Sequence, residues 1–331
     1  MPTDSRPAIE VVKPGLATSV QDTGRPGYYR VGIPPSGALD QYALRAANLL
    51  VGNHESAAAL ECTLLGPQLL FHAEALIAVT GAEMQPKIDG VLQACNVALR
   101  IKAGSTLSFE YVKGGARACL AVAGGIDVPV VLGSRSTYAL GAFGGHQGRR
   151  LQKGDQLAIG RDRGPAREGT ALPERLRTPL AREVALRVLP GLYHHRLTDE
   201  SARTFFEDSW TVAPEADRIG YRYKQGRPLG FRPREQPFGA GADPSNIVDA
   251  CYPIGSIQVP AGLEPIILHR DAVSGGGYAT IGTVISADLD LIGQMQPNHQ
   301  ARFVSVTMSQ ALAARRDAQL RLARLREVLL R

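Results

Sequence analysis

Residues 75–122 read ALIAVTGAEMQPKIDGVLQACNVALRIKAGSTLSFEYVKGGARACLAV. Four short apolar segments in this stretch are bounded by Gly, Asp or Lys-Gly turns, and they cover residues 75–80, 96–101, 107–112 and 119–122. Val97, Leu99 and Ile101 alternate with Ala98 and Arg100, which is the period of a half-buried strand. Strands bounded by turn signals at this spacing are typical of a barrel or sandwich. We therefore predict a mostly β protein with a few helices.

The composition agrees with a turn-rich globular protein. The chain has 331 residues, which suggests about two domains. Its 36 glycines and 22 prolines exceed average usage and indicate many turns. Hydrophobic residues make up 44% and charged residues 21%, so the chain is neither disordered nor a coiled coil. No apolar run approaches the roughly 18 residues of a membrane span, and we predict no membrane association.

The N-terminus and the cysteines predict a cytoplasmic protein. Residues 1–7, MPTDSRP, contain no apolar segment of the kind found in signal peptides. The four cysteines form no C-x-x-C pair and have no regular spacing; they are Cys62, Cys95, Cys119 and Cys251. This usage is typical of a reduced protein without a disulfide framework.

The chain has a net charge of +6, and the excess of basic residues is found mainly in the predicted linker and in the C-terminal tail. Residues 309–331 contain six arginines and two acidic residues, and residues 160–187 contain seven arginines and four acidic residues. A nucleic-acid groove would place positive charge on the folded body, interleaved with aromatic residues. We therefore predict no nucleic-acid partner.

Helices are predicted at three places. Apolar residues recur at helical spacing over residues 39–51, and Gly52 follows as a C-terminal glycine. A second helix is predicted near residues 198–206 with Thr198 as its N-cap. The third covers the Ala-, Leu- and Arg-rich tail. In the second half of the chain, strands are predicted at residues 184–189, 256–259, 265–268, 283–285 and 302–307.

A weak internal repeat suggests two similar β units. The segment VKPGL at 12–16 resembles VLPGL at 188–192, and RPGY at 25–28 resembles RIGY at 218–221. A third, looser pair starts at Gly66 and Gly255, and all three occur in the same order. The predicted organisation is a first β unit over 1–160, a linker over 161–183, a second β unit over 184–308 and a basic helix over 309–331.

The familiar catalytic motifs are absent from the sequence. It contains no G-x-x-x-x-G-K-[ST] phosphate-binding loop, no zincin helix and no G-x-S-x-G nucleophile elbow. His194 and His195 are adjacent, but no Cys or carboxylate ligands are spaced around them, so we predict a surface pair and no metal site.

Three glycine-flanked polar segments remain, namely Ser19–Asp40, Gly133–Gly148 and Asp271–Tyr278. Glycines let backbone N–H groups approach an anionic ligand closely. Arginines can clamp a carboxylate or phosphate, and hydroxyls can orient a small polar substrate. The alternative, tight turns stabilised by Asx, Ser and Arg hydrogen bonds, stays open for each segment. Three such segments in one chain favour a shared pocket.

These segments resemble a known family. The first half contains QDTGRPG at 21–27, GIPPSGALD at 32–40, ANLLVGN at 47–53 and GGIDVPVVLGSRSTY at 124–138. The second half contains DRIGYR at 217–222, QVP at 258–260 and GGY at 276–278. Over about residues 9–308 the chain is similar to the allophanate hydrolase subunit 2 family. This family is also called the biotin-dependent carboxyltransferase family and includes the C subunit of ATP-dependent 5-oxoprolinase.

Two places depart from the family pattern. Ser274-Gly275 stands where the family has Thr-Thr before Gly-Gly-Tyr, and Ala279 stands in place of a Pro after it. Cys251-Tyr252-Pro253 stands where a Ser-rich turn is expected. Both departures lie in the predicted second unit.

The resemblance implies a fold of two cyclophilin-like β-barrel units. It also implies a hetero-oligomer, in which the partner is a B subunit, to which 5-oxoprolinase adds an A subunit. Such an assembly opens the lactam ring of 5-oxo-L-proline to L-glutamate, driven by ATP hydrolysis. Because amide resonance stabilises a lactam, its oxygen must be activated before water attacks, and phosphorylation by ATP is the activation that the resemblance implies. With no standard nucleotide motif in this chain, an ATP site would be non-standard or shared with partner subunits.

Under this leading hypothesis, Asp40 and Asp271 act as catalytic residues that orient the ring amide or transfer a proton. Asn48 and Glu61 brace the loops. The expected substrate-binding residues are Gln21, Asp22, Arg25, Ser36, Arg135, Ser136, Tyr138, Arg218, Tyr221, Gly276, Gly277 and Tyr278.

Two other functions stay open. The chain could be the carboxyltransferase half of a biotin-dependent carboxylase acting on urea or a similar small amide. Since no Met is followed by Lys, biotin would then arrive on another chain. The third reading is a regulatory module, an antagonist of a kinase inhibitor that binds a homologue of the B subunit.

Overall fold

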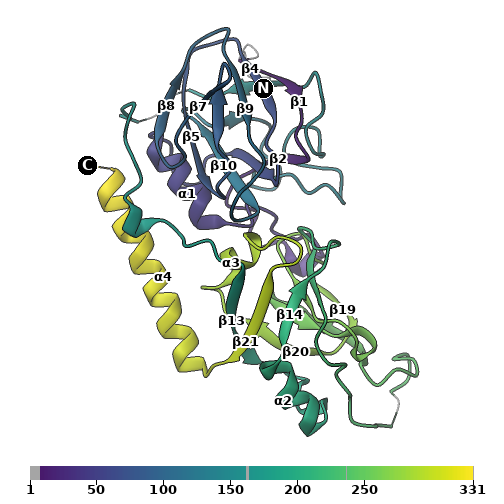
Figure 1. The fold of residues 1–331 in the computed structure, drawn as a ribbon. Helices are drawn as coiled ribbons and strands as arrows, with labels where there is room; N and C mark the ends of the chain where they lie inside the picture. The colour runs from purple at the N-terminus through teal and green to yellow at the C-terminus, as the bar shows by residue number, and fades with distance from the viewer. Residues whose placement is uncertain (1–7, 162–163, 236, 331) are drawn as a thin grey trace. The chain divides into compact units, whose positions relative to one another are not determined.

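The protein is mostly β with four α-helices in the part of the chain that the structure describes (Figure 1). The structure is a computed structural model that describes residues 8–161, 164–235 and 237–330. Residues 1–7, in which no signal peptide is predicted, and Arg331, at the end of the predicted tail helix, lie outside the described residues. The predicted fold class, β-rich with a C-terminal helix, is confirmed.

The chain forms two compact units. Unit 1 contains the residues up to Arg25, then Ser36–Leu180, and then the residues from Arg321 onward. Unit 2 contains Pro26–Pro35 and Ala181–Leu320.

Unit 1 is built from two antiparallel sheets that share one core. Apolar side chains of both sheets form a single buried cluster, including Val11 and Leu69 from one sheet and Leu60 and Leu120 from the other. The seven-stranded sheet has the order β11(Ile126–Asp127)-β12(Gln156–Ile159)-β1(Ile9–Lys13)-β4(Gln68–Phe71)-β9(Thr106–Phe109)-β6(Pro86–Ile88)-β7(Val91–Leu92). The five-stranded sheet has the order β2(Ala17–Gln21)-β3(Ala59–Thr63)-β10(Arg117–Val122)-β5(Ala75–Gly81)-β8(Ala98–Ile101).

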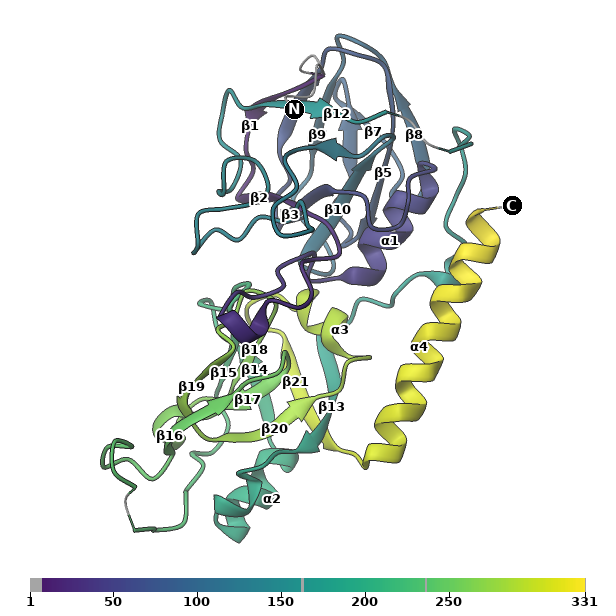
Figure 2. The same cartoon turned by 180° about the vertical axis from the view of Figure 1, so that it is seen from behind.

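Helix α1 (Gln41–Leu50) packs on β5 and β10 of the five-stranded sheet (Figure 2). Its apolar side, with Leu44 and Leu50, is buried against small residues of these strands such as Ala78 and Ala121. Asp40 caps the helix, because its Oδ1 accepts a hydrogen bond of 2.8 Å from the N–H of Ala43. The helix predicted over 39–51 is therefore confirmed.

Unit 2 contains a closed seven-stranded barrel. The barrel closes through β13 and β21, which pair in parallel, whereas its other pairs are antiparallel. The order around the barrel is β13(Glu183–Pro190)-β20(Thr280–Val284)-β17(Ser256–Gln258)-β18(Ile266–Leu268)-β15(Gly220–Lys224)-β14(Ser209–Val212)-β21(Gln300–Ser305). A separate pair, β16 (Asn246–Cys251) and β19 (Gly275–Tyr278), carries the Gly-Gly-Tyr segment.

The remaining helices lie in the second half of the chain. Thr198 caps α2 (Asp199–Glu207) by accepting a hydrogen bond of 3.2 Å from the N–H of Ser201, as predicted. The others are α3 (Leu289–Gly293) and the tail helix α4 (Met308–Leu329). The 3-10 helices are η1 (Tyr29–Val31), η2 (Glu174–Leu176), η3 (His194–Arg196) and η4 (Pro260–Gly262). Among the described residues, every helix is too short or too polar to cross a lipid bilayer.

Most of the predicted linker packs on unit 1. Ala171 forms a β-bridge with Val97, and Leu172 and Leu176 are buried in the cluster around α1. Burial of these leucines removes apolar surface from water and so attaches the segment to the unit. Residues 162–163, also in the predicted linker, lie outside the described residues.

Candidate functional site

Asp22, which follows strand β2, joins two of the predicted polar segments. Its Oδ1 accepts hydrogen bonds from the N–H of Gly24 at 2.7 Å and the hydroxyls of Ser134 at 2.6 Å and Ser136 at 2.5 Å. Its Oδ2 accepts a hydrogen bond of 2.6 Å from the N–H of Arg135. The predicted grouping of Ser19–Asp40 with Gly133–Gly148 is therefore present around one buried carboxylate.

Gln21, Arg25 and Ser36, from the same segment as Asp22, are buried. The Gln21 amide donates to the carbonyl of Thr137 at 3.2 Å and accepts a hydrogen bond of 3.1 Å from the N–H of Gly37. The Arg25 guanidinium donates to the carbonyl of Ser136 and lies 4.9 Å from the centre of the Phe143 ring. These contacts tie the loops together, and the ligand contacts predicted for these residues stay predictions.

The glycines after Ser136 allow close packing of the loop. A Cβ at Gly144 would lie 2.1 Å from the carbonyl oxygen of Ser136, and one at Gly145 would lie 1.8 Å from Oγ1 of Thr137. Tyr138 is largely buried, with its ring 5.4 Å from that of Phe143 in an edge-on arrangement. Here glycine serves packing, because any side chain at these positions would overlap the backbone or Thr137.

A cavity of about 740 Å³ opens beside Asp22, and we call it the Asp22 cavity. Arg135 lines it with a side chain that is 39% exposed. Its guanidinium is fixed by a hydrogen bond of 2.8 Å from Nε to the Val128 carbonyl and an ion pair of 3.2 Å from Nη2 to Asp127. Nη1 makes no hydrogen bond to any residue that the structure describes. A fixed guanidinium with an available edge is suited to bind a carboxylate.

The glycine turn on the wall of the Asp22 cavity offers no spare N–H at Gly124 or Gly125. The side-chain Oδ1 of Asn53 accepts a hydrogen bond of 2.7 Å from Gly124 N, and the backbone carbonyl of Val122 accepts one of 2.8 Å from Gly125 N. Asn53 also donates to Asn48 at 3.0 Å, so it holds the turn against α1. Anion binding on this wall therefore depends on side chains.

Asn53 is a positioning residue that sequence reasoning missed, although it closes the ANLLVGN motif. The two residues expected to brace the loops do make bracing contacts. Asn48 donates to the carbonyl of Ala57 at 2.8 Å, and Glu61 accepts a hydrogen bond of 2.7 Å from the N–H of Leu39.

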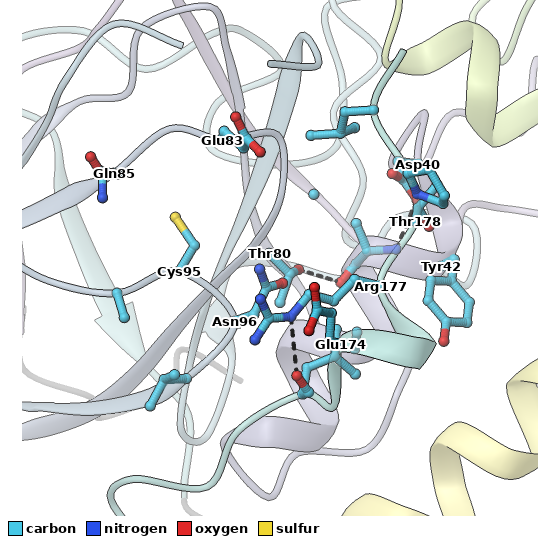
Figure 3. Close-up of a pocket in the computed structure, with 18 of the residues that line it drawn as sticks. Asp40, Tyr42, Thr80, Glu83, Gln85, Cys95, Asn96, Glu174, Arg177 and Thr178 are labelled. Atoms are coloured by element: carbon cyan, nitrogen blue, oxygen red, sulfur yellow. Dashed lines mark hydrogen bonds between the residues drawn. The ribbon is translucent and has the colours of Figure 1, made fainter. Parts of the chain in front are cut away.

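Asp40 lines a different cavity of about 750 Å³, which we call the Asp40 cavity (Figure 3). The two cavities have no lining residue in common. Because Asp40 is almost fully buried and caps α1, one of its oxygens serves the helix. The structure thus separates Asp40 from the Asp22 cluster.

In unit 2, the predicted residues Arg218 and Asp271 form an ion pair. The guanidinium contacts both carboxylate oxygens, with Nε–Oδ2 at 2.7 Å and Nη2–Oδ1 at 3.3 Å. Tyr29 lies nearby, where burial raises the pKa of its phenol to about 12. Tyr221 is buried on β15 with its ring 6.1 Å from that of His269.

The two departures from the family pattern lie on paired strands. Cys251 pairs with Gly275, and the N–H of Tyr252 donates to the carbonyl of Ser274 at 2.8 Å. The Tyr252 hydroxyl accepts a hydrogen bond of 2.7 Å from Tyr278 N and donates to Tyr278 O at 2.8 Å. Gly276 in β19 lies against the Tyr252 ring, since a Cβ at Gly276 would lie 3.0 Å from that ring. The departures therefore form one local structure, with Gly277 and the half-exposed Tyr278 beside it.

Asp155 forms a second buried carboxylate cluster in unit 1. It accepts hydrogen bonds from Arg149 Nη1 and Nη2 at 2.7 and 2.8 Å and from Gln152 N at 2.7 Å. Its Oδ1 also lies 3.4 Å from Nε2 of His146. The hydrogen bonds from Arg149 are the main cause that lowers the pKa of Asp155 to about 2.

This pKa predicts how stability depends on pH. A carboxyl with a depressed folded pKa stabilises the fold above its unfolded pKa of about 3.9, and the contribution is lost as the pH falls through the folded value of about 2. We expect Asp155→Asn to lower the free energy of unfolding by about 1–2 kcal/mol at pH 7 and to have little effect near pH 2. Urea denaturation across this pH range measures the difference, and an equal loss at both ends would contradict the prediction.

Comparison with known proteins places the chain in a family. The profile of the carboxyltransferase domain, subdomain A and B, matches residues 31–305. The chain is 38% identical over 315 residues to urea amidolyase of Lachancea kluyveri, covering 91% of this chain but only 17% of that protein. It is 36% identical over 311 residues to the 5-oxoprolinase C subunit of Escherichia coli (strain K12), covering 94% of this chain and 95% of that protein.

A solved structure agrees with this placement. The crystal structure of Kluyveromyces lactis urea carboxylase matches with a TM-score of 0.91 and 37% identity, over 100% of this chain and 30% of that chain. The family profile, the sequence identities and the shared fold therefore lead to one conclusion: the chain belongs to the carboxyltransferase domain family, in the part formed by subdomains A and B.

Proposed function

We propose that the chain is the C subunit of an ATP-dependent 5-oxoprolinase, a cytoplasmic enzyme that also needs the A and B subunits. The observation that carries the proposal is Arg135 in the Asp22 cavity, fixed by Val128 and Asp127 with one edge available. 5-Oxo-L-proline has a carboxylate that this guanidinium can bind, whereas urea is neutral. The identities of 36% and 32% to two proteins named as the C subunit of 5-oxoprolinase support the same choice.

The proposed reaction is hydrolysis of a lactam. The carbonyl oxygen of the lactam takes the γ-phosphoryl group of ATP, and ADP leaves. Water attacks the ring carbon, and the C–N bond breaks as the nitrogen gains a proton, which gives an acyl phosphate. A second water hydrolyses the acyl phosphate to the glutamate carboxylate and inorganic phosphate. In this proposal Arg135 binds the substrate carboxylate in the Asp22 cavity. Asp40 lines the other cavity and caps α1, and Asp271 pairs with Arg218 in unit 2, so the catalytic roles predicted for these two carboxylates stay predictions and are not part of this site. ATP binds in the assembled complex. In this proposal Arg161, which also lines the Asp22 cavity, contacts a phosphate of ATP.

Reconstitution tests the proposal. The purified A and B subunits, together with this chain, should release L-glutamate from 5-oxo-L-proline in an ATP-dependent reaction. Omitting this chain should lower the rate by at least about 100-fold, as expected when a required binding surface is lost. The measurement is glutamate formed per ATP hydrolysed, and an unchanged rate without this chain would refute the proposal.

The second candidate is the carboxyltransferase part of a biotin-dependent carboxylase acting on urea. Its support is the match to Kluyveromyces lactis urea carboxylase over the whole of this chain. In that case urea, and not 5-oxo-L-proline, should stimulate ATP hydrolysis, and a biotinylated partner should be recovered with the chain.

A further inference from the structure

The Asp40 cavity is separate from the proposed substrate site. Its volume of about 750 Å³ lies within the range typical of small-molecule sites. All of its lining residues belong to unit 1. They come from Asp40 and α1, from residues 80–85 and 94–97, from Lys113, whose ammonium group contacts Gln85 and Glu110, and from residues 172–180. Figure 3 shows Glu83, Cys95, Asn96 and Arg177 around the same space.

Side chains of opposite charge line this cavity without partners. Glu83 and Glu174 make no hydrogen bond or ion pair through their carboxylates with any residue that the structure describes. Arg177 uses Nε to donate to the carbonyl of Leu172 at 3.2 Å, and within the described chain its two Nη atoms make no hydrogen bond. Two acidic residues and an arginine, all three exposed to solvent, therefore line the cavity without a protein partner among the described residues.

The backbone fixes where the acidic and basic groups stand. The N–H of Glu83 donates to Gly114 O at 2.8 Å, and its carbonyl accepts a hydrogen bond of 2.9 Å from Lys113 N. The Arg177 N–H donates to Glu174 O at 2.9 Å, at the end of η2. Both charges act on the Cys95 thiol, whose pKa is raised to about 11 by burial and by Glu83 and is lowered by Arg177. Glu83, Cys95 and Arg177 all line this one cavity.

We propose that the Asp40 cavity binds a free α-amino acid, with its carboxylate on Arg177 and its ammonium group on Glu83. A simple anion would be repelled by the two carboxylates, and a simple cation would be repelled by Arg177, whereas a zwitterion satisfies both. The apolar atoms of Tyr42, Leu172 and Leu180 line the rest of the cavity and can contact the side chain.

L-Glutamate is the first ligand to test. This choice rests on the proposed function, since 5-oxoprolinase would release L-glutamate, but the class of ligand rests on the cavity alone. The full chain is titrated by calorimetry with L-glutamate, with other free α-amino acids, with glutarate, which lacks the ammonium group, and with 5-oxo-L-proline, whose nitrogen is neutral. We expect the amino acids to bind at least tenfold more tightly than glutarate or 5-oxo-L-proline at this site.

Charge-removing variants identify the site. Glu83→Gln and Arg177→Gln should each weaken amino-acid binding at least tenfold, which corresponds to about 1.4 kcal/mol. Arg175→Gln is the matched control, because Arg175 is exposed on the same 3-10 helix and does not line the cavity. Binding that is unchanged in both variants, equal binding of glutarate, or no binding of any amino acid would overturn the proposal. The titration needs neither ATP nor the partner proteins, so its result is independent of whether the complex hydrolyses 5-oxo-L-proline.

Discussion

Asp22→Ala is expected to lower the free energy of unfolding by about 3–5 kcal/mol. The carboxylate accepts four hydrogen bonds, and the residue is largely buried. Removing it leaves the hydroxyls of Ser134 and Ser136 and two backbone N–H groups without their acceptor. Each unsatisfied buried donor costs about 1–3 kcal/mol, and relaxation of the loop recovers part of the sum. Urea denaturation of the full chain measures the change.

A control variant tests whether the loss of stability is specific to the buried Asp22 or follows from removing any aspartate in a turn. Asp217 precedes the segment RIGY of the internal repeat, as Asp22 precedes RPGY, and its Oδ1 accepts hydrogen bonds from the N–H groups of Ile219 and Gly220 at 2.8 and 3.1 Å. It is half-exposed, so water can replace it, and Asp217→Ala should cost about 1 kcal/mol or less. Equal losses in the two variants would show that Asp22 acts as an ordinary turn residue.

Local sequence patterns predicted much of the secondary structure, because the spacing of apolar residues and the capping of helix ends depend on residues close together in the chain. The apolar spacing over 39–51 and the glycine after it predicted α1, found at Gln41–Leu50. Thr198 predicted the start of α2, because a hydroxyl at the N-cap bonds the free N–H groups of the first turn. Strand β8 begins at Ala98, two residues later than predicted, because Asn96 has a φ of 63° and belongs to the preceding turn.

Membership of the two units could not be read from the same patterns. Residues 26–35 follow Arg25 of unit 1 and precede Ser36 of unit 1, yet they belong to unit 2. In α4, Leu325 is buried in the cluster around α1, although its helix begins in unit 2. Periodicity tells which face of an element is buried, but it does not tell which part of the chain covers that face.

The candidate site was predicted in part for a related reason. Glycine and a polar side chain in a loop are typical both of a ligand-binding turn and of a tightly packed one. From the sequence, Arg25 and Gly144 are predicted to belong to a ligand-binding turn. Their contacts are those of a tightly packed turn, since a Cβ at Gly144 would lie 2.7 Å from the Arg25 guanidinium. Arg135 also lies in a loop rich in glycine and polar residues, but it lines a cavity. Only the three-dimensional contacts distinguish Arg135 from Arg25.

Arg135→Gln is expected to raise the KM for 5-oxo-L-proline of the reconstituted enzyme by about 10- to 100-fold with a smaller change in kcat. The reason is that a hydrogen bond to a charged group contributes about 1.5–3 kcal/mol. The substrate carboxylate does not take part in bond breaking, so this contact should stabilise ground state and transition state alike and act on KM. The fold should be retained, because the bond to Asp22 comes from the Arg135 backbone N–H.

Two further variants make the result specific to the guanidinium. Arg135→Lys keeps the charge but loses the planar group that reaches Val128 and Asp127 together, so its KM should lie between those of the wild type and Arg135→Gln. Arg150→Gln removes an exposed arginine of the same unit that does not line the Asp22 cavity, and it should leave KM unchanged. If Arg135→Gln lowers kcat at an unchanged KM, the guanidinium acts on the reaction step and another group binds the carboxylate. If Arg150→Gln raises KM equally, the effect is one of overall charge, and the Asp22 cavity has no special part in substrate binding.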